Sequence, residues 1–275
     1  MPELPEVESI RRSLKLLEGR TIRDVILSPL APVETTRPAA IRRSLADSTL
    51  TALERHGKYL LLRNQAGSAL VLHLGMSGRL RFFEAEPPHY PKHTHLRLHF
   101  SDASVLVFED ARRFGTLSLS QKPGGGDNAF LSRLGPDYLE GPLSDEEFIA
   151  RCRRHNGLNL KALALHQGIG AGLGNIYACE ALYRAALDPR RGVGRTSDVK
   201  LAELLKAARE TLRLGIRHGG SSLRDYFDGL GNRGVMKDFL QVYGREGQST
   251  LDGRGMVRRI VQQSRSTWFC PQVQR

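Results

Sequence analysis

The chain has few cysteines and no long apolar segment among its 275 residues. Its three cysteines, at 152, 179 and 270, are too few and too scattered for a disulfide framework or a cysteine metal cluster. The longest apolar runs, such as residues 69–72, are far shorter than the roughly 20 residues of a membrane-spanning helix. The N-terminus lacks the basic and apolar pattern of a signal peptide, because Glu3, Glu6 and Glu8 come first. We therefore expect a protein of the reducing cytoplasm that does not cross a membrane.

Acidic residues are also in short supply relative to basic ones. The chain has 29 Asp and Glu against 41 Lys and Arg, a net charge of +12. A hydrophobic share of 40% is enough to build buried cores, which excludes a disordered tail protein. An enzyme of small neutral metabolites has no evident use for such an excess of positive charge. A polyanionic partner is therefore expected, and at this point both nucleic acid and an anionic membrane surface remain open.

The first half of the chain predicts one helix followed by an antiparallel sheet or sandwich. Apolar residues at 7, 10, 14 and 17 have helical spacing, with Gly19 where the helix would end. Between Thr21 and Ser120 the pattern changes to short β-rich runs separated by turn residues. These runs are 58–63, 69–74, 95–100, 105–108 and 116–119.

The second half predicts helices and a terminal hairpin. Residues 121–128 carry Pro123 and three glycines and are expected to form a loop or linker. Ser144 followed by acidic residues is typical of a capped helix start, and helical periodicity recurs over 176–187 and 199–216. From residue 239, alternating residues with interspersed glycines predict a β-hairpin.

The N-terminal sequence Met1-Pro2-Glu3 has chemical potential of its own. Removal of Met1 would leave a proline α-amine, whose pKa of about 8 makes it far more nucleophilic near neutral pH than a lysine. Such an amine can condense with an aldehyde carbon, and Glu3 beside it could move the protons. Taken alone, the same residues fit an ordinary processed terminus whose glutamates stabilise a helix start.

Several motifs together extend the interpretation. MPELPEVE, GKYLL, LHLGMSGRL, KHTH, ARRFG, LGPDYL, GLGNIYACEALY, VYGREG and RSTWFC occur in this order along nearly the whole chain. In these motifs the sequence resembles the bacterial formamidopyrimidine-DNA glycosylases. The resemblance implies an α+β fold with an N-terminal helix and antiparallel β-sandwich, a helical domain with a helix-two-turn-helix, and a β-hairpin finger.

The resemblance also implies catalytic residues. Pro2 corresponds to the nucleophile that attacks the sugar C1′ of an oxidised purine nucleotide, and Glu3 to the acid-base residue that helps to open the sugar. Lys58 matches the lysine that donates a proton in β-elimination, and Arg265 matches the arginine credited with δ-elimination. Glu6 is expected to support the helix start. Without the motif, Lys58 would be interpreted as a surface lysine.

Further residues are implied to contact DNA. Met76, Arg112 and Phe114 correspond to the three side chains that fill the gap left by a flipped base, although Met76 and Phe114 alone would suit a core. A phosphate contact is implied for His73 and a DNA-backbone contact for Asn175, and His93 and Arg154 are also implied to bind DNA. Residues 221–226 correspond to the loop that covers the everted purine. The family usually has Asp where this chain has His166, so the role of that position is open.

Two patterns resemble a metal site and a nucleotide-binding loop, but neither meets the requirements of such a site. His93, His95 and His99 alternate with apolar residues and are expected on the outer face of a strand, not in a metal site. The glycine-rich segment 168–175 matches neither a Walker A motif nor a dinucleotide fingerprint, although its turn could present backbone N–H groups to a phosphate.

The C-terminal segment 238–275, here called the finger, departs from the family. Over residues 239–275, six arginines against Glu246 and Asp252 leave a net charge of +4, which suits either a solvated basic face or a DNA-gripping element. Most relatives have four zinc-binding cysteines, but these positions are Thr250, Gly253, Cys270 and Val273 here. One thiolate cannot make a structural zinc site, so we predict a finger without zinc or other cofactor, packed around Trp268 and Phe269.

The sequence thus predicts a bifunctional DNA glycosylase and AP lyase for oxidised purines, acting on double-stranded DNA as a monomer in the bacterial nucleoid. The predicted domains are 1–130, a linker at 131–143, a helical domain at 144–237 and the finger at 238–275. One alternative is an oxidised-pyrimidine enzyme like endonuclease VIII, which Leu4 disfavours because that group generally has glycine there. Another is a lesion-binding protein with impaired catalysis, which intact Pro2, Glu3 and Lys58 disfavour.

Overall fold

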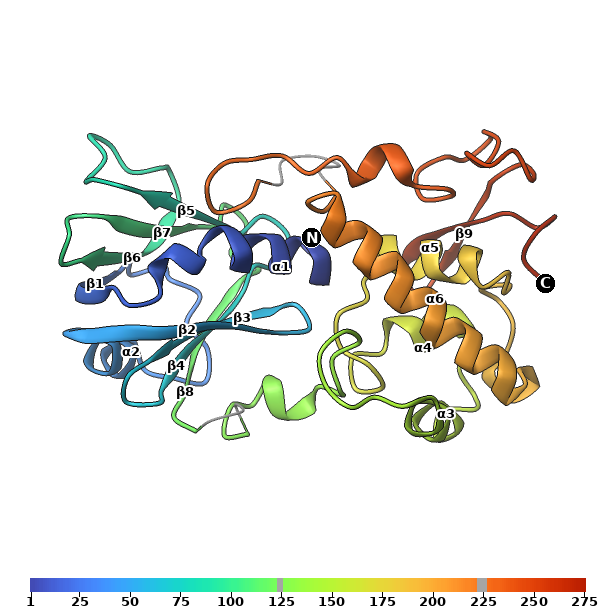
Figure 1. The fold of residues 1–275 in the computed structure, drawn as a ribbon, viewed down its shortest axis with the longest axis horizontal. Coiled ribbons are helices and arrows are strands. Elements are labelled where there is room, and N and C mark those ends of the chain that lie inside the picture. The colour runs from blue at the N-terminus through green and yellow to red at the C-terminus, as the bar shows by residue number, and fades with distance from the viewer. Residues whose placement is uncertain (123–125, 222–226) are drawn as a thin grey trace. The chain divides into compact units, whose positions relative to one another are not determined.

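The computed structural model describes residues 1–122, 126–221 and 227–275. Its internal contacts divide the chain into two compact units, Met1–Arg133 with Gly219–Gly234, and Leu134–His218 with Val235–Arg275 (Figure 1). The predicted domains differ here, because they placed 219–234 with the helices that follow residue 144. Residues 123–125 of the expected loop at 121–128 and residues 222–226 of the predicted lesion-covering loop lie outside the described residues. Among the described residues, no helix is long and apolar enough to cross a membrane.

The first unit is built on an antiparallel β-sandwich. Its strands are hydrogen-bonded in the order β5-β7-β6-β1-β2-β3-β4-β8. β1 and β2 pair only at Thr21↔Thr49 and Ile22↔Ser48, and the two layers meet at this junction (Figure 1). The strands are β1 (Thr21–Leu27), β2 (Ser48–His56), β3 (Tyr59–Asn64), β4 (Ala69–His73), β5 (Arg79–Phe83), β6 (Thr94–Phe100), β7 (Val105–Glu109) and β8 (Thr116–Ser120).

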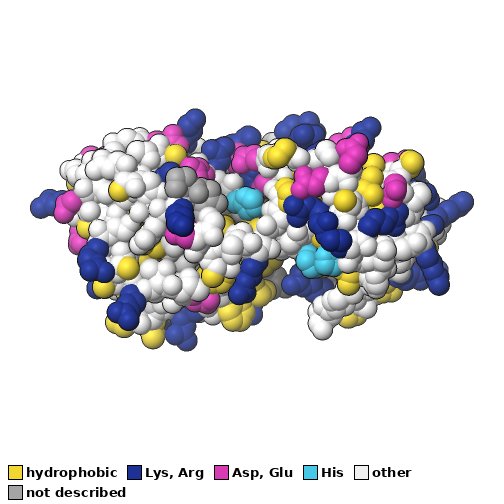
Figure 2. All heavy atoms as spheres, turned by 90° about the horizontal axis from the view of Figure 1, so that it is seen from below, with side chains coloured by type: hydrophobic (Ala, Val, Ile, Leu, Met, Phe, Trp, Pro, Cys, Tyr) yellow, Lys and Arg dark blue, Asp and Glu magenta, His cyan; other side chains and the backbone are white. Residues whose placement is uncertain are grey.

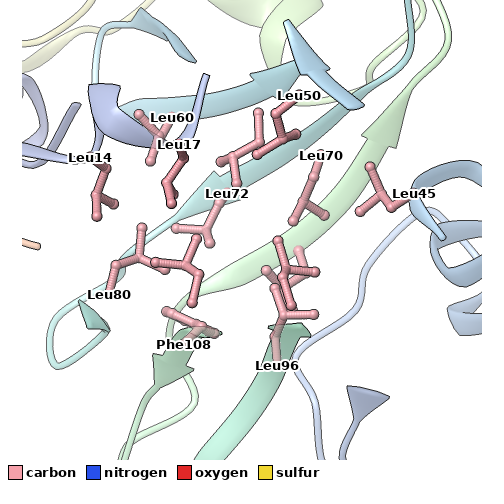
Figure 3. Packing of buried hydrophobic residues seen from close by; sticks show 14 of the residues in the cluster. Leu14, Leu17, Leu45, Leu50, Leu60, Leu70, Leu72, Leu80, Leu96 and Phe108 are labelled. Carbon is pink, nitrogen blue, oxygen red and sulfur yellow. The ribbon is translucent and has the colours of Figure 1, made fainter. Parts of the chain in front are cut away.

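Leucine side chains from both layers fill the core of this sandwich. Leu60 and Leu72 come from one layer, and Leu96 and Phe108 from the other; all four are at most 1% exposed. Figure 3 shows them converging with Leu14, which follows the N-terminal helix. The alternation of inward apolar residues along each strand is what the period-two pattern of the sequence predicts. All five predicted strands are present, and the structure adds β1, β2 and β5.

The N-terminal helix covers the core as its apolar spacing predicts. It consists of α1 (Leu4–Ser13) and a 3-10 turn at Lys15–Leu17, and it buries Val7, Ile10, Leu14 and Leu17. Gly19 follows with a φ of +87°, a conformation that glycine adopts without steric cost and that ends the helix. A second helix, α2 (Pro38–Leu45), was not predicted; it begins at a proline and buries only Ile41 and Leu45.

The second unit is mainly helical. Its α-helices are α3 (Asp145–Arg153), α4 (Leu160–Leu165), α5 (Asn175–Arg184) and α6 (Asp198–Arg217). Ser144 caps α3 by accepting a hydrogen bond of 3.2 Å from the Glu147 backbone N–H, as the sequence predicts. Short 3-10 turns lie at Val193–Arg195 and Met236–Phe239, and Leu131–Arg133 forms another at the end of the first unit.

The finger forms the predicted hairpin from β9 (Arg258–Gln262) and β10 (Arg265–Phe269). Gln263 and Ser264 both have positive φ values, of 45° and 57°, as a two-residue type I′ turn requires. The buried carboxylate of Glu180 on α5 accepts backbone hydrogen bonds of 2.8–2.9 Å from residues 241, 242 and 243. The start of the finger is therefore anchored to α5 by this carboxylate.

Candidate active site

The chain terminus that carries Pro2 is held against the start of α1. Pro2 is partly exposed, whereas Glu3 is 2% exposed and is the N-cap of the helix. The Glu3 side chain accepts the Glu6 backbone N–H, and the Glu6 carboxylate accepts the Glu3 backbone N–H at 2.8 Å. This reciprocal capping box confirms that Glu6 supports the helix start. It leaves Pro2 accessible beside a carboxylate.

Glu6 also fastens a distant segment of the first unit. Its other oxygen accepts the Ser221 backbone N–H at 2.6 Å. Gly220 has a φ of +84°, and a Cβ there would lie 2.9 Å from Glu6 Cγ. Residues 219–221, which lead into the predicted lesion-covering loop, are therefore tied to α1.

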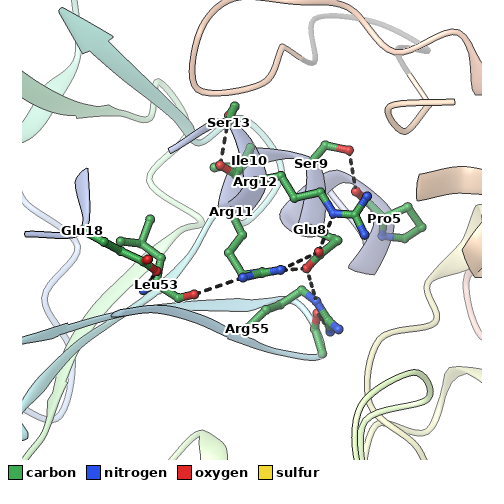
Figure 4. A network of polar contacts seen from close by, with 11 residues as sticks. Pro5, Glu8, Ser9, Ile10, Arg11, Arg12, Ser13, Glu18, Leu53 and Arg55 are labelled. Carbon is green, nitrogen blue, oxygen red and sulfur yellow. Dashed lines mark hydrogen bonds and ion pairs between the residues drawn. The ribbon is translucent and has the colours of Figure 1, made fainter. Parts of the chain in front are cut away.

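Lys58 is buried in the turn between β2 and β3, with 7% exposure. Gly57 before it has a φ of +57°, and Arg55 donates to the Gly57 carbonyl at 3.2 Å. The same guanidinium lies 3.2 Å from the buried Glu8 carboxylate of α1 (Figure 4). The turn that carries Lys58 is thereby connected to the helix that follows Pro2, which corrects the interpretation of Lys58 as a surface lysine.

His73 lies at the end of β4, directly opposite Tyr59. The two rings are 4.8 Å apart, and the Gly75 backbone N–H donates to His73 Nδ1 at 3.1 Å. Burial, together with the positive charge of Lys58, lowers the pKa of His73 to about 4. The imidazole is therefore neutral near pH 7, and its proton is on Nε2, where it can be donated to an anion.

The structure brings the three predicted gap-filling side chains together. Met76 and Phe114 are 48% and 53% exposed on two neighbouring loops, so they are not core residues. The Arg112 guanidinium lies 4.6 Å from the centre of the Phe114 ring. A Cβ at Gly75 would lie 2.2 Å from the Phe114 carbonyl carbon, so the loops meet backbone to backbone.

The histidines of the KHTH segment separate into different environments. His93 is exposed, just before β6, in a left-handed conformation with a φ of 67°. The prediction that all three lie on an outer face is wrong for His95, which is 5% exposed and hydrogen-bonds Ser28 Oγ and the Asp110 carbonyl, each at 3.0 Å. His99 pairs with Glu86 at 3.2 Å. In the described part of the chain, no three His, Cys, Asp or Glu side chains are grouped to hold a metal.

In the second unit, the start of α5 meets the hairpin. Asn175 is the first residue of α5, and its Nδ2 donates to the Ser266 carbonyl at 2.9 Å. The exposed Arg265 precedes Ser266 in β10, so Asn175 and Arg265 are neighbours. Arg154 is also exposed but lies on another element, at the end of α3. These three residues belong to the second unit, and the other predicted site residues belong to the first.

A glutamine that sequence reasoning missed shapes the glycine-rich turn. Gln167 donates to the carbonyls of Leu165 and Leu173 at 2.9 and 2.8 Å and accepts from the Gly172 N–H at 3.0 Å. Its only signal in the sequence is its place directly before the glycines. The exposed His166 beside it lies with its ring 4.6 Å from that of His155.

The finger residues at the family's zinc positions do not fit a metal. Thr250 Oγ1 accepts the Arg254 N–H at 3.0 Å and hydrogen-bonds Asp252 at 2.7 Å. The fully buried Cys270 thiol contacts Gln272 Oε1 at 3.3 Å. Gly253 and Val273 offer no side-chain donor to a metal.

Comparisons with known proteins agree with this architecture. The family model described as formamidopyrimidine-DNA glycosylase N-terminal domain matches residues 1–117, and the one described as formamidopyrimidine-DNA glycosylase H2TH domain matches residues 134–226. The chain belongs to the formamidopyrimidine-DNA glycosylase family. Family membership confirms the predicted fold class, including the helix-two-turn-helix.

Individual relatives match over their full lengths. Formamidopyrimidine-DNA glycosylases of Paracoccus denitrificans and Novosphingobium aromaticivorans are 40% and 41% identical, with all of this chain and all of each relative covered. A Lactococcus lactis Fpg mutant, solved with DNA containing Fapy-dG, matches with a TM-score of 0.90 at 30% identity and complete coverage of both chains. The MutM (Fpg) protein of Thermus thermophilus matches with a TM-score of 0.87 at 36% identity over 99% and 98% of the two chains.

Proposed function

We propose that this chain is a bifunctional DNA glycosylase and AP lyase that removes oxidised purines, such as 8-oxoguanine opposite cytosine and formamidopyrimidines, from double-stranded DNA. The observation that carries the proposal is the accessible Pro2 beside the buried Glu3, which is the N-cap of α1. The chain that carries them belongs to the formamidopyrimidine-DNA glycosylase family. Matching Lactococcus lactis Fpg structures are complexes with DNA containing Fapy-dG or an abasic site, which supports lesion-containing DNA as the partner.

The chemistry begins at the proline amine exposed by loss of Met1. Its nitrogen bonds to the sugar C1′ while the bond from C1′ to the base breaks, and the base leaves with the bonding electrons and takes up a proton. Glu3 moves the protons as the sugar ring opens to an iminium at Pro2. This positive iminium draws electrons from the sugar, and β-elimination followed by δ-elimination then cuts the strand. Lys58 serves the first elimination and Arg265 the second.

DNA binding rests on phosphate contacts and on the gap-filling side chains. His73, neutral and with a proton on Nε2, suits a phosphate oxygen, and His93, Arg154 and Asn175 make further contacts with the DNA. Met76, Arg112 and Phe114 enter the space left by the flipped nucleotide. On the face that Figure 2 draws, Lys and Arg side chains outnumber acidic ones, in keeping with the net charge of +12.

The chain acts as a monomer in the bacterial cytoplasm, at the nucleoid.

The finger works without zinc. A polar cluster of Thr250, Asp252 and Arg254, joined by Tyr183 of α5, supports the finger in place of a metal. Tyr183 Oη donates to the Asp252 carboxylate, lying 2.7 and 2.8 Å from its two oxygens, and Arg254 Nε lies 2.7 Å from the same carboxylate.

Borohydride trapping tests the proposed reaction. The purified protein is reduced on a duplex containing 8-oxoguanine opposite cytosine, and mass spectrometry locates the adduct. We expect a covalent complex at Pro2 that Pro2→Gly abolishes or strongly reduces. Absence of any adduct, on this duplex and on an abasic one, would contradict the proposal and favour a lesion-binding protein without catalysis. Faster excision of an oxidised pyrimidine than of 8-oxoguanine would favour an endonuclease VIII-like specificity.

A further inference from the structure

Asp110 lies at the base of both loops that carry the gap-filling side chains. It is fully buried directly after β7, with 0% exposure. One carboxylate oxygen accepts hydrogen bonds from Ser77 Oγ and from the Arg112 backbone N–H, the latter at 3.2 Å. The other accepts the Gly115 backbone N–H at 2.7 Å. A single side chain therefore holds the Met76 loop on one side and both ends of the 112–115 segment on the other.

Ser77 completes the connection between the loops. Its Oγ donates to Asp110 and accepts the Arg112 backbone N–H at 3.1 Å. Ser77 follows Met76 directly, so its hydroxyl fixes the backbone next to that inserting side chain.

The Asp110 backbone reaches a third segment. Its N–H donates to the His93 carbonyl at 3.0 Å, and its own carbonyl lies 3.0 Å from His95 Nε2. The loop that presents His93 is thereby tied to the same residue. This link explains why His95 is buried, contrary to the alternation of its strand.

Glycines allow the backbones of the two loops to lie in close contact. A Cβ at Gly75 would collide with the Phe114 backbone at 2.2 Å, and one at Gly115 would lie 2.8 Å from the His73 carbonyl oxygen. Close backbone contact and the shared carboxylate thus restrict the same pair of loops. Exposed loops normally move independently, but these two are joined at their bases.

We infer that Asp110 is a positioning residue that makes Met76, Arg112 and Phe114 one preassembled wedge, so that all three enter the duplex together. Opening a base stack costs free energy, and loops that had to be ordered during insertion would add to that cost. A wedge ordered beforehand lowers the barrier to base eversion. The inference rests on the proposed function, because it concerns the step before Pro2 meets the sugar.

The test measures how the Asp110→Asn variant acts on two substrates, one duplex and one single-stranded. An asparagine keeps the size of the side chain but replaces one acceptor oxygen by an NH₂ donor, which cannot accept from Ser77 or Gly115. We expect single-turnover excision from an 8-oxoguanine:cytosine duplex to fall at least tenfold, because small misplacements of reacting parts carry large rate penalties. Cleavage of a single-stranded abasic oligonucleotide, which has no stack to open and no orphan base, should stay within about twofold of the unaltered protein.

A fluorescent reporter separates wedge insertion from general damage. With 2-aminopurine placed next to the lesion, the fluorescence rise on unstacking should be slower in Asp110→Asn than in the unaltered protein. Ser77→Ala, which removes one arm of the network, should show a smaller effect in the same direction, and it serves as the second variant if Asp110→Asn does not fold. Asp102→Asn is the matched control, since Asp102 accepts the Ser104 backbone N–H at 3.1 Å in another turn of the same unit. Asp102→Asn should change neither excision from the duplex nor cleavage of the single-stranded abasic oligonucleotide.

Two results would overturn the inference. One is equal loss of activity on the duplex and on the single-stranded abasic substrate, which would mean that Asp110 supports the fold or the chemistry rather than insertion. The other is unchanged excision and unchanged fluorescence kinetics in folded Asp110→Asn and Ser77→Ala. Failure of the proposed function itself would be distinguishable, because the unaltered protein would then form no adduct with borohydride.

Discussion

At the scale of single residues, Glu8 shows how the first unit keeps a charge buried. Its side chain is 4% exposed and lies 2.7–3.2 Å from the guanidinium groups of Arg11, Arg12 and Arg55. Burial raises the pKa of Glu8, but hydrogen bonds from Arg11 and Arg12 and the charges of Arg11 and Arg55 outweigh it and lower the pKa to about 2. The carboxylate thus remains ionised and links α1 to the Lys58 turn.

Replacing Glu8 by Gln is expected to destabilise the protein by roughly 3 kcal/mol, because Arg55 would stay buried without this carboxylate. Denaturant unfolding of Glu8→Gln measures the loss. Glu54→Gln is the control, since Glu54 pairs with Arg63 at 2.6 Å but its side chain is 43% exposed. Equal, small effects of both substitutions would contradict this account.

His73 predicts a dependence of stability on pH. Its pKa of about 4 in the folded protein lies below its ordinary value of 6.5, so below pH 6.5 the unfolded chain binds a proton that the folded one does not. Stability is therefore fully retained above pH 6.5 and lost as pH falls towards 4, by on the order of 3 kcal/mol. Unfolding curves at pH 7.5, 6, 5 and 4 should show a smaller decline for His73→Gln. An identical decline in both proteins would assign the pH dependence to other groups.

At the scale of elements, the finger combines a polar cluster with apolar packing. Cys270, Val242 and Val257 are buried together with Cys179 and Tyr183 of α5, and Trp268 packs against this group. The pKa of Asp252 is lowered to about 2, since hydrogen bonds from Tyr183, Thr250 and Arg254 outweigh the opposing effect of burial. Packing and hydrogen bonds thus support the finger around Thr250 and Cys270.

Treatment with a zinc chelator is therefore expected to change neither the melting temperature nor lesion cleavage. Asp252→Asn should lower finger stability by about 1 kcal/mol, because it weakens the hydrogen bonds to Tyr183 and Arg254. Limited proteolysis of the C-terminal segment measures finger stability, both with and without chelator and in Asp252→Asn. Asp145→Asn, at the exposed start of α3, is the control. Loss of activity on chelation would show that a metal acts in this chain.

At the scale of the whole molecule, positive charge should dominate DNA affinity. Arg154 is proposed to contact the DNA, and Lys58 and Arg265 to act where β- and δ-elimination release the phosphates. We therefore expect all three cations to meet phosphates, and each such contact releases counterions. The logarithm of the association constant should therefore fall linearly with the logarithm of salt concentration, with a slope of about −3 or steeper.

Arg154→Ala should reduce that slope by about 1 without changing the preference for lesion DNA. Fluorescence anisotropy over a salt series gives the slopes. Both proteins carry Pro2→Gly, which prevents turnover, and no borohydride is added. Arg43→Ala is the matched control, because Arg43 is an exposed residue of α2, and it should leave the slope unchanged. A shallow slope in the unaltered protein would contradict a phosphate-dominated interface.

Local patterns were sufficient to predict much of the fold. The spacing of Val7, Ile10 and Leu14 predicts α1, and Ser144 predicts the start of α3, because helix periodicity and capping are local in sequence. β1 has no such clean pattern, since its pairing with β6 shifts register between Ile22 and Asp24. α2 is only two turns long and buries two side chains, too few to produce a period.

The sequence by itself determined the family, and it predicts Pro2, Glu3 and the gap-filling residues as site residues, because these lie in contiguous motifs. Only the tertiary structure decided that Lys58 is buried, that His95 turns inward and that 219–234 packs with the first unit. It alone revealed Asp110 and Glu6 as connecting residues. Their partners lie 33 residues away at Ser77 and 215 residues away at Ser221, and contacts over such separations leave no periodic trace in the chain.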